Sequence, residues 1–211
     1  MDLIEDHKNH FLYKRIQSTP RGKVMLAIGL EKLLAQKDFN SITTAEIARA
    51  SGINESLIYR YFGEKRGLLH YILAEHQTDS LQLILSDLAP ITGAVNKLKK
   101  IIWRTIDSWS KDRVYAKILL IEVRNSPAYY QSETYLIIKK YCQLIQSIIQ
   151  EGKNNGEISG DVSPWFLMQV ILGSIEHVVL PSLIFDKKFD VELFAENIYR
   201  IVFRGVLTAD G

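Results

Sequence analysis

A short polar and aromatic segment, residues 52–69, carries the side chains with the clearest potential for chemistry. Tyr59, Arg60, Tyr61 and Phe62 follow one another in a stretch expected to form a short helix, and such a helix cannot bury all four side chains. Exposed tyrosines can pack against sugars and donate hydroxyl hydrogen bonds to phosphate oxygens. The segment therefore favours contact with a nucleic-acid backbone.

The rest of the chain lacks the patterns of common enzyme and metal sites. It has no nucleophile-elbow glycine pattern, phosphate-binding loop, paired-histidine zinc helix or dinucleotide fingerprint, and its five histidines are scattered. A single cysteine, Cys142, excludes an intramolecular disulfide and a cysteine-rich zinc site. Glu176 and His177 are too sparse for a metal site. We expect no catalytic residue, no cofactor and no metal, and predict that the protein is not an enzyme.

Composition is that of a soluble protein with a substantial core, since 47% of the 211 residues are hydrophobic and 24% are charged. We find no apolar run of the roughly 18 residues that suggest a membrane span. The N-terminus lacks the apolar core of a secretory signal. These features predict a cytoplasmic protein with no membrane partner.

The charge is nearly balanced overall, at +2, but unevenly distributed. Residues 7–23 carry five Lys and Arg and no acid, and the first 67 residues carry eleven Lys and Arg against eight Asp and Glu. Residues 1–19 are therefore expected to be either a basic arm that contacts phosphate, an extra helix, or a solvated tail.

Apolar residues recur at spacings of three and four throughout, which predicts an all-α protein. The helices expected in the N-terminal part span 20–37, 43–51, 55–62 and 64–88. Thr43 and Glu46 have the spacing of a capping box, and Asn54 can cap the following helix. Gly63 separates that helix from the long one, which would measure roughly 37 Å at 1.5 Å per residue.

The two short helices have the features of a helix-turn-helix, whose second helix enters the major groove of DNA. Ala48 is small where the helices would cross, and Gly52 can adopt the left-handed conformation that the turn requires. Ile53 and Ile58 can bury against Ile47. The polar and aromatic residues named above would then remain near the outer face.

The stretch "ITTAEIARASGINESLIYRYFGEKRGLLHYIL" resembles the DNA-binding signature of TetR-type transcriptional regulators. The resemblance covers about residues 21–73. The agreeing positions are Thr43, Ile47, Ala48, Gly52, Ile53, Tyr59, Phe62, Lys65, Leu68 and Leu69. It implies a DNA-binding domain at 20–67, containing three helices, and a helical body at 68–211 that binds an effector and dimerises.

The resemblance also assigns residues to DNA contact. They are Thr43, Thr44, Asn54, Glu55, Ser56, Leu57, Tyr59, Arg60, Tyr61 and Lys65. Thr43, Thr44 and Lys65 would meet phosphate, while residues 54–57 would enter the groove, where glutamate can accept a hydrogen bond from cytosine N4. Each has a structural alternative: Thr43 can cap its helix, Tyr59 can be partly buried, and Glu55 and Lys65 can be ordinary surface charges.

Helices are expected in the body over 92–110, 112–124, 127–153, 163–184 and 190–207. The resemblance implies that the last two pair with a second subunit. The apolar residues expected at that interface are Val170, Val191, Phe194, Ile198, Ile201, Val202 and Val206. Burial in the core of one subunit is the alternative.

Aliphatic and aromatic residues of the middle helices predict a cavity for a small hydrophobic effector, because apolar cavities favour apolar guests. The candidate lining residues are Trp103, Ile106, Trp109, Leu120, Val123, Tyr130, Tyr141, Phe166 and His177, for each of which core packing is the alternative. The function expected is that of a homodimeric repressor released from a palindromic operator in double-stranded DNA by such an effector. A DNA-organising protein without an effector and a helical lipid carrier are the alternatives.

Overall fold

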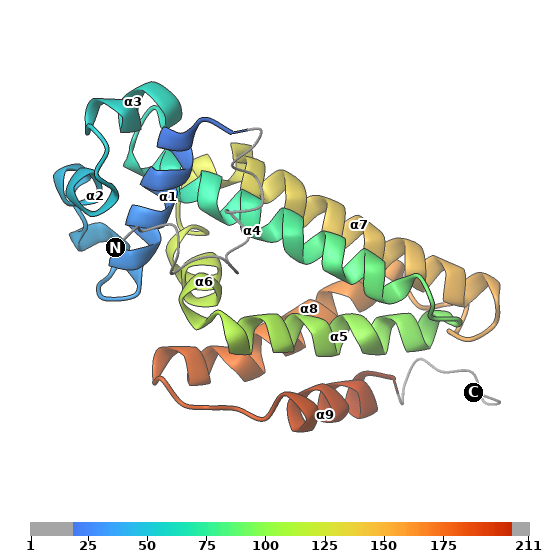
Figure 1. Ribbon diagram of the computed structural model, residues 1–211. Helices are drawn as coiled ribbons and strands as arrows, with labels where there is room; N and C mark the ends of the chain where they lie inside the picture. The colour runs from blue at the N-terminus through green and yellow to red at the C-terminus, as the bar shows by residue number, and fades with distance from the viewer. Residues whose placement is uncertain (1–18, 204–211) are drawn as a thin grey trace. The chain divides into compact units, whose positions relative to one another are not determined.

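The computed structural model describes residues 19–203, which are predominantly helical (Figure 1). The chain divides into two compact units: Met1–Asp79 with Pro127–Ile137, and Ser80–Ser126 with Ile138–Gly211. The expected basic arm or helix at 1–19 lies almost wholly outside the described residues, as does Val206. The division between the units falls inside the long helix, twelve residues beyond the boundary expected at residue 67.

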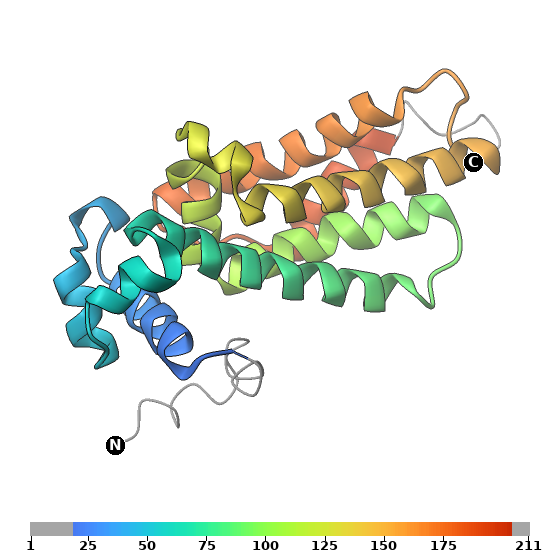
Figure 2. The ribbon, with the colours of Figure 1, turned by 90° about the horizontal axis from the view of Figure 1, so that it is seen from above.

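The first unit contains three short helices and the beginning of a long one. Its elements are α1 (Arg21–Leu34), the 3₁₀ turn η2 (Phe39–Ser41), α2 (Thr44–Ser51), α3 (Ser56–Phe62), the first part of α4 (Lys65–Leu88), the 3₁₀ helix η4 (Pro127–Gln131) and the first residues of α7 (Glu133–Asn154). Helix α4 is one continuous helix in both views (Figure 1, Figure 2) and contributes residues to both units. It is therefore a covalent, helical connection between them.

The expected helix-turn-helix is present in α2 and α3. Thr43 caps α2 in a capping box with Glu46, and α2 ends at Gly52, whose φ of 66° is left-handed. Ile47 and Ile58 are completely buried, as their positions on the inner faces of the two helices require. Helix α3 begins one residue later than expected, at Ser56.

Helix α1 approaches the C-terminal turn of α2 closely at Gly29. A Cβ atom at position 29 would lie 2.8 Å from the Cβ of Ser51 and 3.0 Å from its backbone nitrogen. Ala48, expected where the two short helices cross, is half-buried. The absence of a side chain at Gly29 therefore permits α1 to pack directly on the C-terminal turn of α2.

The second unit is a helical body. Its elements are the end of α4, α5 (Ala94–Lys111), α6 (Arg113–Lys117), the π-helical segment η3 (Ile118–Glu122), most of α7 (Glu133–Asn154), α8 (Pro164–Ile184) and α9 (Val191–Phe203). The continuous helix expected over 112–124 is thus a short α-helix followed by a π-helical segment. The helix expected over 127–153 is divided, because Pro127–Gln131 forms the 3₁₀ helix η4 and Ser132 Oγ then accepts a hydrogen bond from the Tyr135 amide.

Helices α5, α8 and α9 pack together and, with parts of α4 and α7, enclose the apolar core of this unit. The core includes Ile101, Ile145 and Ile171, all completely buried. Both oxygens of the Glu157 carboxylate accept hydrogen bonds from the first amides of α5, at 3.0 and 3.1 Å. This contact stabilises α5 because the amides at a helix N-terminus have no partner within the helix.

Among the described residues, helix α8 is long and apolar enough to cross a membrane by length and composition, although Glu176 and His177 interrupt its apolar residues. Much of the helix is exposed on the protomer. Leu167, Ile171 and Ile175 on one side of α8 are buried in the core, whereas Phe166 and Val170 on another side are exposed. A helix that is apolar all round is expected to be covered on more than one side.

Candidate nucleic-acid interface and apolar groove

The outer surface of α2 and α3 presents the polar side chains expected to contact DNA. Tyr59 is 53% exposed, and Thr43, Asn54, Ser56 and Arg60 are also exposed. They are positioned by the buried isoleucines on the opposite faces of the two short helices. Neighbouring hydroxyl, amide and guanidinium groups of this kind can donate to phosphate oxygens and to base edges.

Thr43 serves the fold through the capping box. Its Oγ1 accepts from the Glu46 amide at 3.2 Å, and the Glu46 carboxylate accepts from the Thr43 amide at 2.8 Å. The Lys37 ammonium donates to the same carboxylate at 2.6 Å. The hydrogen bond from Lys37, followed by those from Thr43, lowers the pKa of Glu46 to about 2. The cap is confirmed, and a phosphate contact by Thr43 stays a prediction.

Thr44, Glu55 and Tyr59 form a polar cluster that joins the N-terminus of α2 to α3. The Thr44 hydroxyl donates a hydrogen bond to the Glu55 carboxylate. The Tyr59 hydroxyl lies 3.5 Å from Thr44 Oγ1, at the outer limit of a hydrogen bond. Glu55 is half-buried and is therefore more than a solvated surface acid.

Helix α3 is the recognition helix, the second helix of the helix-turn-helix. Some of the remaining side chains at and in this helix face solvent, and others pack against α1. Asn54 Oδ1 accepts from the Ser56 amide at 2.9 Å and so forms a local turn just before α3, whose N-cap residue is Glu55 rather than Asn54. Leu57 and Tyr61 are half-buried and lie close to Gly22 of α1. Lys23 places its ammonium 5.8 Å from the Tyr61 ring. Of the two tyrosines expected to meet the DNA backbone, Tyr59 is thus the more accessible.

Lys65 is engaged by the protein itself. Its ammonium donates to the carbonyl oxygens of Phe39 at 2.9 Å and Ile42 at 2.6 Å, and lies 4.3 Å from the centre of the Phe39 ring. These contacts fix the loop that precedes α2 against the start of α4. Lys65 is therefore not an ordinary surface lysine, and its expected phosphate contact stays a prediction.

Five of the nine residues expected to line an effector cavity lie in or against the core of the second unit: Trp103, Ile106, Trp109, Leu120 and Tyr141. Ile106, Trp109 and Val123 are buried, which core packing explains. Phe166 is 62% exposed on α8, and Tyr130 is exposed in the first unit. Leu120 is half-buried, and its side chain packs against the core of the second unit.

The other aromatic candidates have polar partners. The Tyr141 hydroxyl pairs with Thr105 Oγ1 at 2.7 Å, and burial raises the pKa of Tyr141 despite that hydrogen bond. Trp103 Nε1 donates to Glu192 at 2.5 Å. Contact of any of these residues with an effector stays a prediction.

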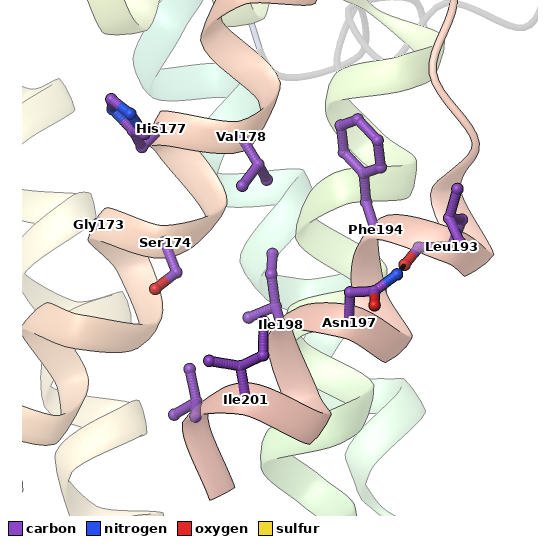
Figure 3. Close-up of a pocket in the computed structure, with 10 residues that line it drawn as sticks. Gly173, Ser174, His177, Val178, Leu193, Phe194, Asn197, Ile198 and Ile201 are labelled. Atoms are coloured by element: carbon purple, nitrogen blue, oxygen red, sulfur yellow. Dashed lines mark hydrogen bonds between the residues drawn. The ribbon is translucent and has the colours of Figure 1, made fainter.

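A groove of about 730 Å³ runs between α8 and α9 (Figure 3). Its lining residues are Gly173, Ser174, His177, Val178, Leu193, Phe194, Asn197, Ile198, Ile201 and Val202. The lining is mainly apolar and includes four residues of the expected interface, together with His177 from the expected effector cavity. Sequence reasoning missed Val178 and Leu193, although the apolar character of α8 on all sides was visible in its composition.

Both the N-terminal and the C-terminal part of the chain match models of known protein families. Residues 29–72 match the family model described as "Bacterial regulatory proteins, tetR family", and residues 75–205 match "YsiA-like protein, C-terminal region". The "Fatty acid metabolism regulator protein" of Bacillus subtilis is 22% identical over 190 residues, which cover 90% of this chain and 97% of that protein.

Two solved structures share the fold. The fatty acid degradation regulator FadR of Bacillus halodurans has a TM-score of 0.79 and 21% identity, over 89% of this chain and 97% of that one. FadR of Bacillus subtilis in complex with stearoyl-CoA has a TM-score of 0.78 and 21% identity, over 86% and 97%.

Proposed function

Because the chain belongs to the TetR family of bacterial regulatory proteins, we propose that it is a repressor that binds a palindromic operator as a homodimer. A hydrophobic small molecule bound by the second unit releases the operator. The observation that carries the proposal is the capped helix-turn-helix with its exposed polar and aromatic outer face. The function proposed is that of a cytoplasmic regulator rather than an enzyme.

The dimer is supported by the surface of α8 and α9. Val170 is 38% exposed and Ile201 is 72% exposed, and both flank or line the apolar groove between the helices. A second copy would cover these side chains and remove their apolar surface from water. Two recognition helices would then bind two half-sites, which a single short helix cannot do selectively.

The effector class is supported by the comparisons. The similar FadR structure of Bacillus subtilis contains stearoyl-CoA, and the similar sequence from that organism is named a fatty acid metabolism regulator. We extend this chemistry to the present chain and propose a long-chain acyl compound as its effector. The large aliphatic core of the second unit is compatible with a lipophilic guest.

Selection of bound sequences from random duplexes tests the proposal most directly. The expected result is a palindrome whose half-sites are about one helical turn apart, with binding that weakens as salt rises. Enrichment of no sequence, with salt-sensitive binding to every duplex, would support a DNA-organising protein. Absence of DNA binding, with retention of an acyl ligand, would support a lipid carrier.

A further inference from the structure

The hydroxyl hydrogen of Thr44 can be donated to only one acceptor at a time, either the Glu55 carboxylate or a DNA phosphate oxygen. The Thr44 hydroxyl has a single hydrogen to donate, and the structure shows it donated to the Glu55 carboxylate. If Thr44 is to donate to a phosphate oxygen, this hydrogen bond must break. The carboxylate then loses its donor and, as an ionised group that only accepts, needs another one.

We propose that Glu55 determines sequence selectivity by competing with DNA phosphate for the Thr44 hydroxyl. The inference rests on the proposed function and deepens it. On a duplex that offers no donor to the carboxylate, the Thr44–Glu55 bond persists and the Thr44 hydroxyl makes no phosphate contact. On a site that offers a cytosine amino group, the carboxylate accepts from cytosine N4 and the Thr44 hydroxyl becomes available to phosphate.

The geometry supports such an exchange. Thr44 is the first residue of α2, where helix amides favour an anion, and Glu55 immediately precedes α3. One side chain therefore lies at an expected backbone contact and the other at an expected base contact. The nearby Tyr59 hydroxyl, 3.5 Å from Thr44 Oγ1, can accept or donate as the pair rearranges. Base readout and phosphate contact are consequently coupled.

A double-mutant cycle on the full chain tests this coupling. Binding by the parent, Thr44→Val, Glu55→Ala and the double variant is measured on the selected operator and on a noncognate duplex. Valine keeps the branched shape of threonine and removes only the hydroxyl. Removal of a negative charge favours DNA binding in either background, so that general effect cancels in the cycle. Glu64→Ala, which alters an exposed acid outside the cluster, measures the general effect separately.

With Thr44 present, Glu55→Ala should strengthen noncognate binding about five- to tenfold, because a hydrogen bond to a charged group no longer competes with phosphate. In the Thr44→Val background, that gain should fall to the level produced by Glu64→Ala. Thr44→Ser, which keeps the hydroxyl, should behave like the parent. Operator binding should lose its preference for cytosine when Glu55 is replaced.

Equal gains from Glu55→Ala in the parent and in the Thr44→Val background would overturn the inference and leave the proposed function intact. So would an unchanged noncognate affinity when Glu55→Ala is made in the parent. A parent chain that selects no sequence would instead overturn the proposed function and this inference together. Circular dichroism melting of each variant separates a loss of folding from a loss of contact.

Discussion

At the residue scale, Lys65 is expected to contact phosphate and also stabilises the fold through its hydrogen bonds to two backbone carbonyl groups. Replacement by methionine removes the donor for two carbonyl groups, Phe39 O and Ile42 O. We expect Lys65→Met to lower the free energy of unfolding by about 1–2 kcal/mol. Urea titration followed by far-ultraviolet circular dichroism measures this loss. Arg60→Met, at an exposed position of α3, should weaken DNA binding without lowering the free energy of unfolding. A parental urea midpoint for Lys65→Met would contradict the structural role.

His70 should make the stability of the first unit depend on pH. Burial, reinforced by the charge of Arg66, lowers the pKa of His70, and its Nε2 is buried with no hydrogen-bond partner among the described residues. The unfolded chain therefore binds a proton more readily, so stability is lost as pH falls through the unfolded value of about 6.5. His70→Gln should flatten the melting temperature between roughly pH 7 and 5. An unchanged slope would exclude this histidine as the cause.

For the candidate DNA-binding surface, the sequence predicted the exposed side chains better than it predicted their hydrogen-bond partners within the protein. Local spacing was sufficient for the Thr43–Glu46 cap and for the left-handed Gly52. The contact between Thr44 and Glu55 was not predictable in the same way, because it joins residues on two helices across a turn. The contacts of Lys65 likewise depend on how the loop before α2 folds back.

At the scale of elements, the crossing of α1 and α2 depends on Gly29. An alanine there gains up to about 1 kcal/mol of helix propensity but overpacks the contact with Ser51, which typically costs about 1–3 kcal/mol. We expect Gly29→Ala to lower the thermal midpoint. Adding Ser51→Gly should recover part of the loss, because the nearest atom, Ser51 Cβ at 2.8 Å, is removed. A Gly29→Ala protein more stable than the parent would refute the close approach.

The positions of most helices were predictable, but the break in the middle of the body was not. The π-helical segment Ile118–Glu122 is only five residues long, too short for its apolar spacing to be told apart from that of an α-helix. Residues 127–131 became a separate turn because Ser132 caps the helix that follows. The cavity prediction rested on residue types alone, and the same types also fill an ordinary core.

At the scale of the whole molecule, charges placed at the α8–α9 surface should separate the proposed dimer. Ile201→Glu and Val170→Glu alter exposed positions, whereas Ile198 is only 5% exposed and a charge there would disturb the protomer core. We expect monomers by sedimentation equilibrium and a marked loss of operator affinity. Leu85→Glu, at an exposed position of α4, is the matched control and should remain dimeric. A dimer that persists in the Ile201 and Val170 variants would indicate another interface.

Helix α4 connects the effector-binding unit proposed above to the DNA-binding helices. Helix α4 has 24 residues, a length of about 36 Å at 1.5 Å per residue, and contributes residues to both units. We expect a change at its C-terminal part to reach the recognition helices through this helix. A ligand shifts the equilibrium only by binding the DNA-free form more tightly, and a hundredfold preference corresponds to about 2.7 kcal/mol of coupling.

We therefore expect saturating stearoyl-CoA to weaken operator binding by up to about a hundredfold while the protein remains dimeric. Anisotropy titrations of labelled operator measure the affinity, and sedimentation measures the oligomeric state under the same conditions. Coenzyme A and free stearate, tested separately, distinguish recognition of the headgroup from recognition of the chain. Unchanged operator affinity with demonstrated acyl-CoA binding would show that this ligand does not operate the switch. If the dimer dissociates at the same ligand concentration, release does not occur by movement within an intact dimer. The operator would instead be released because each monomer contacts only one half-site.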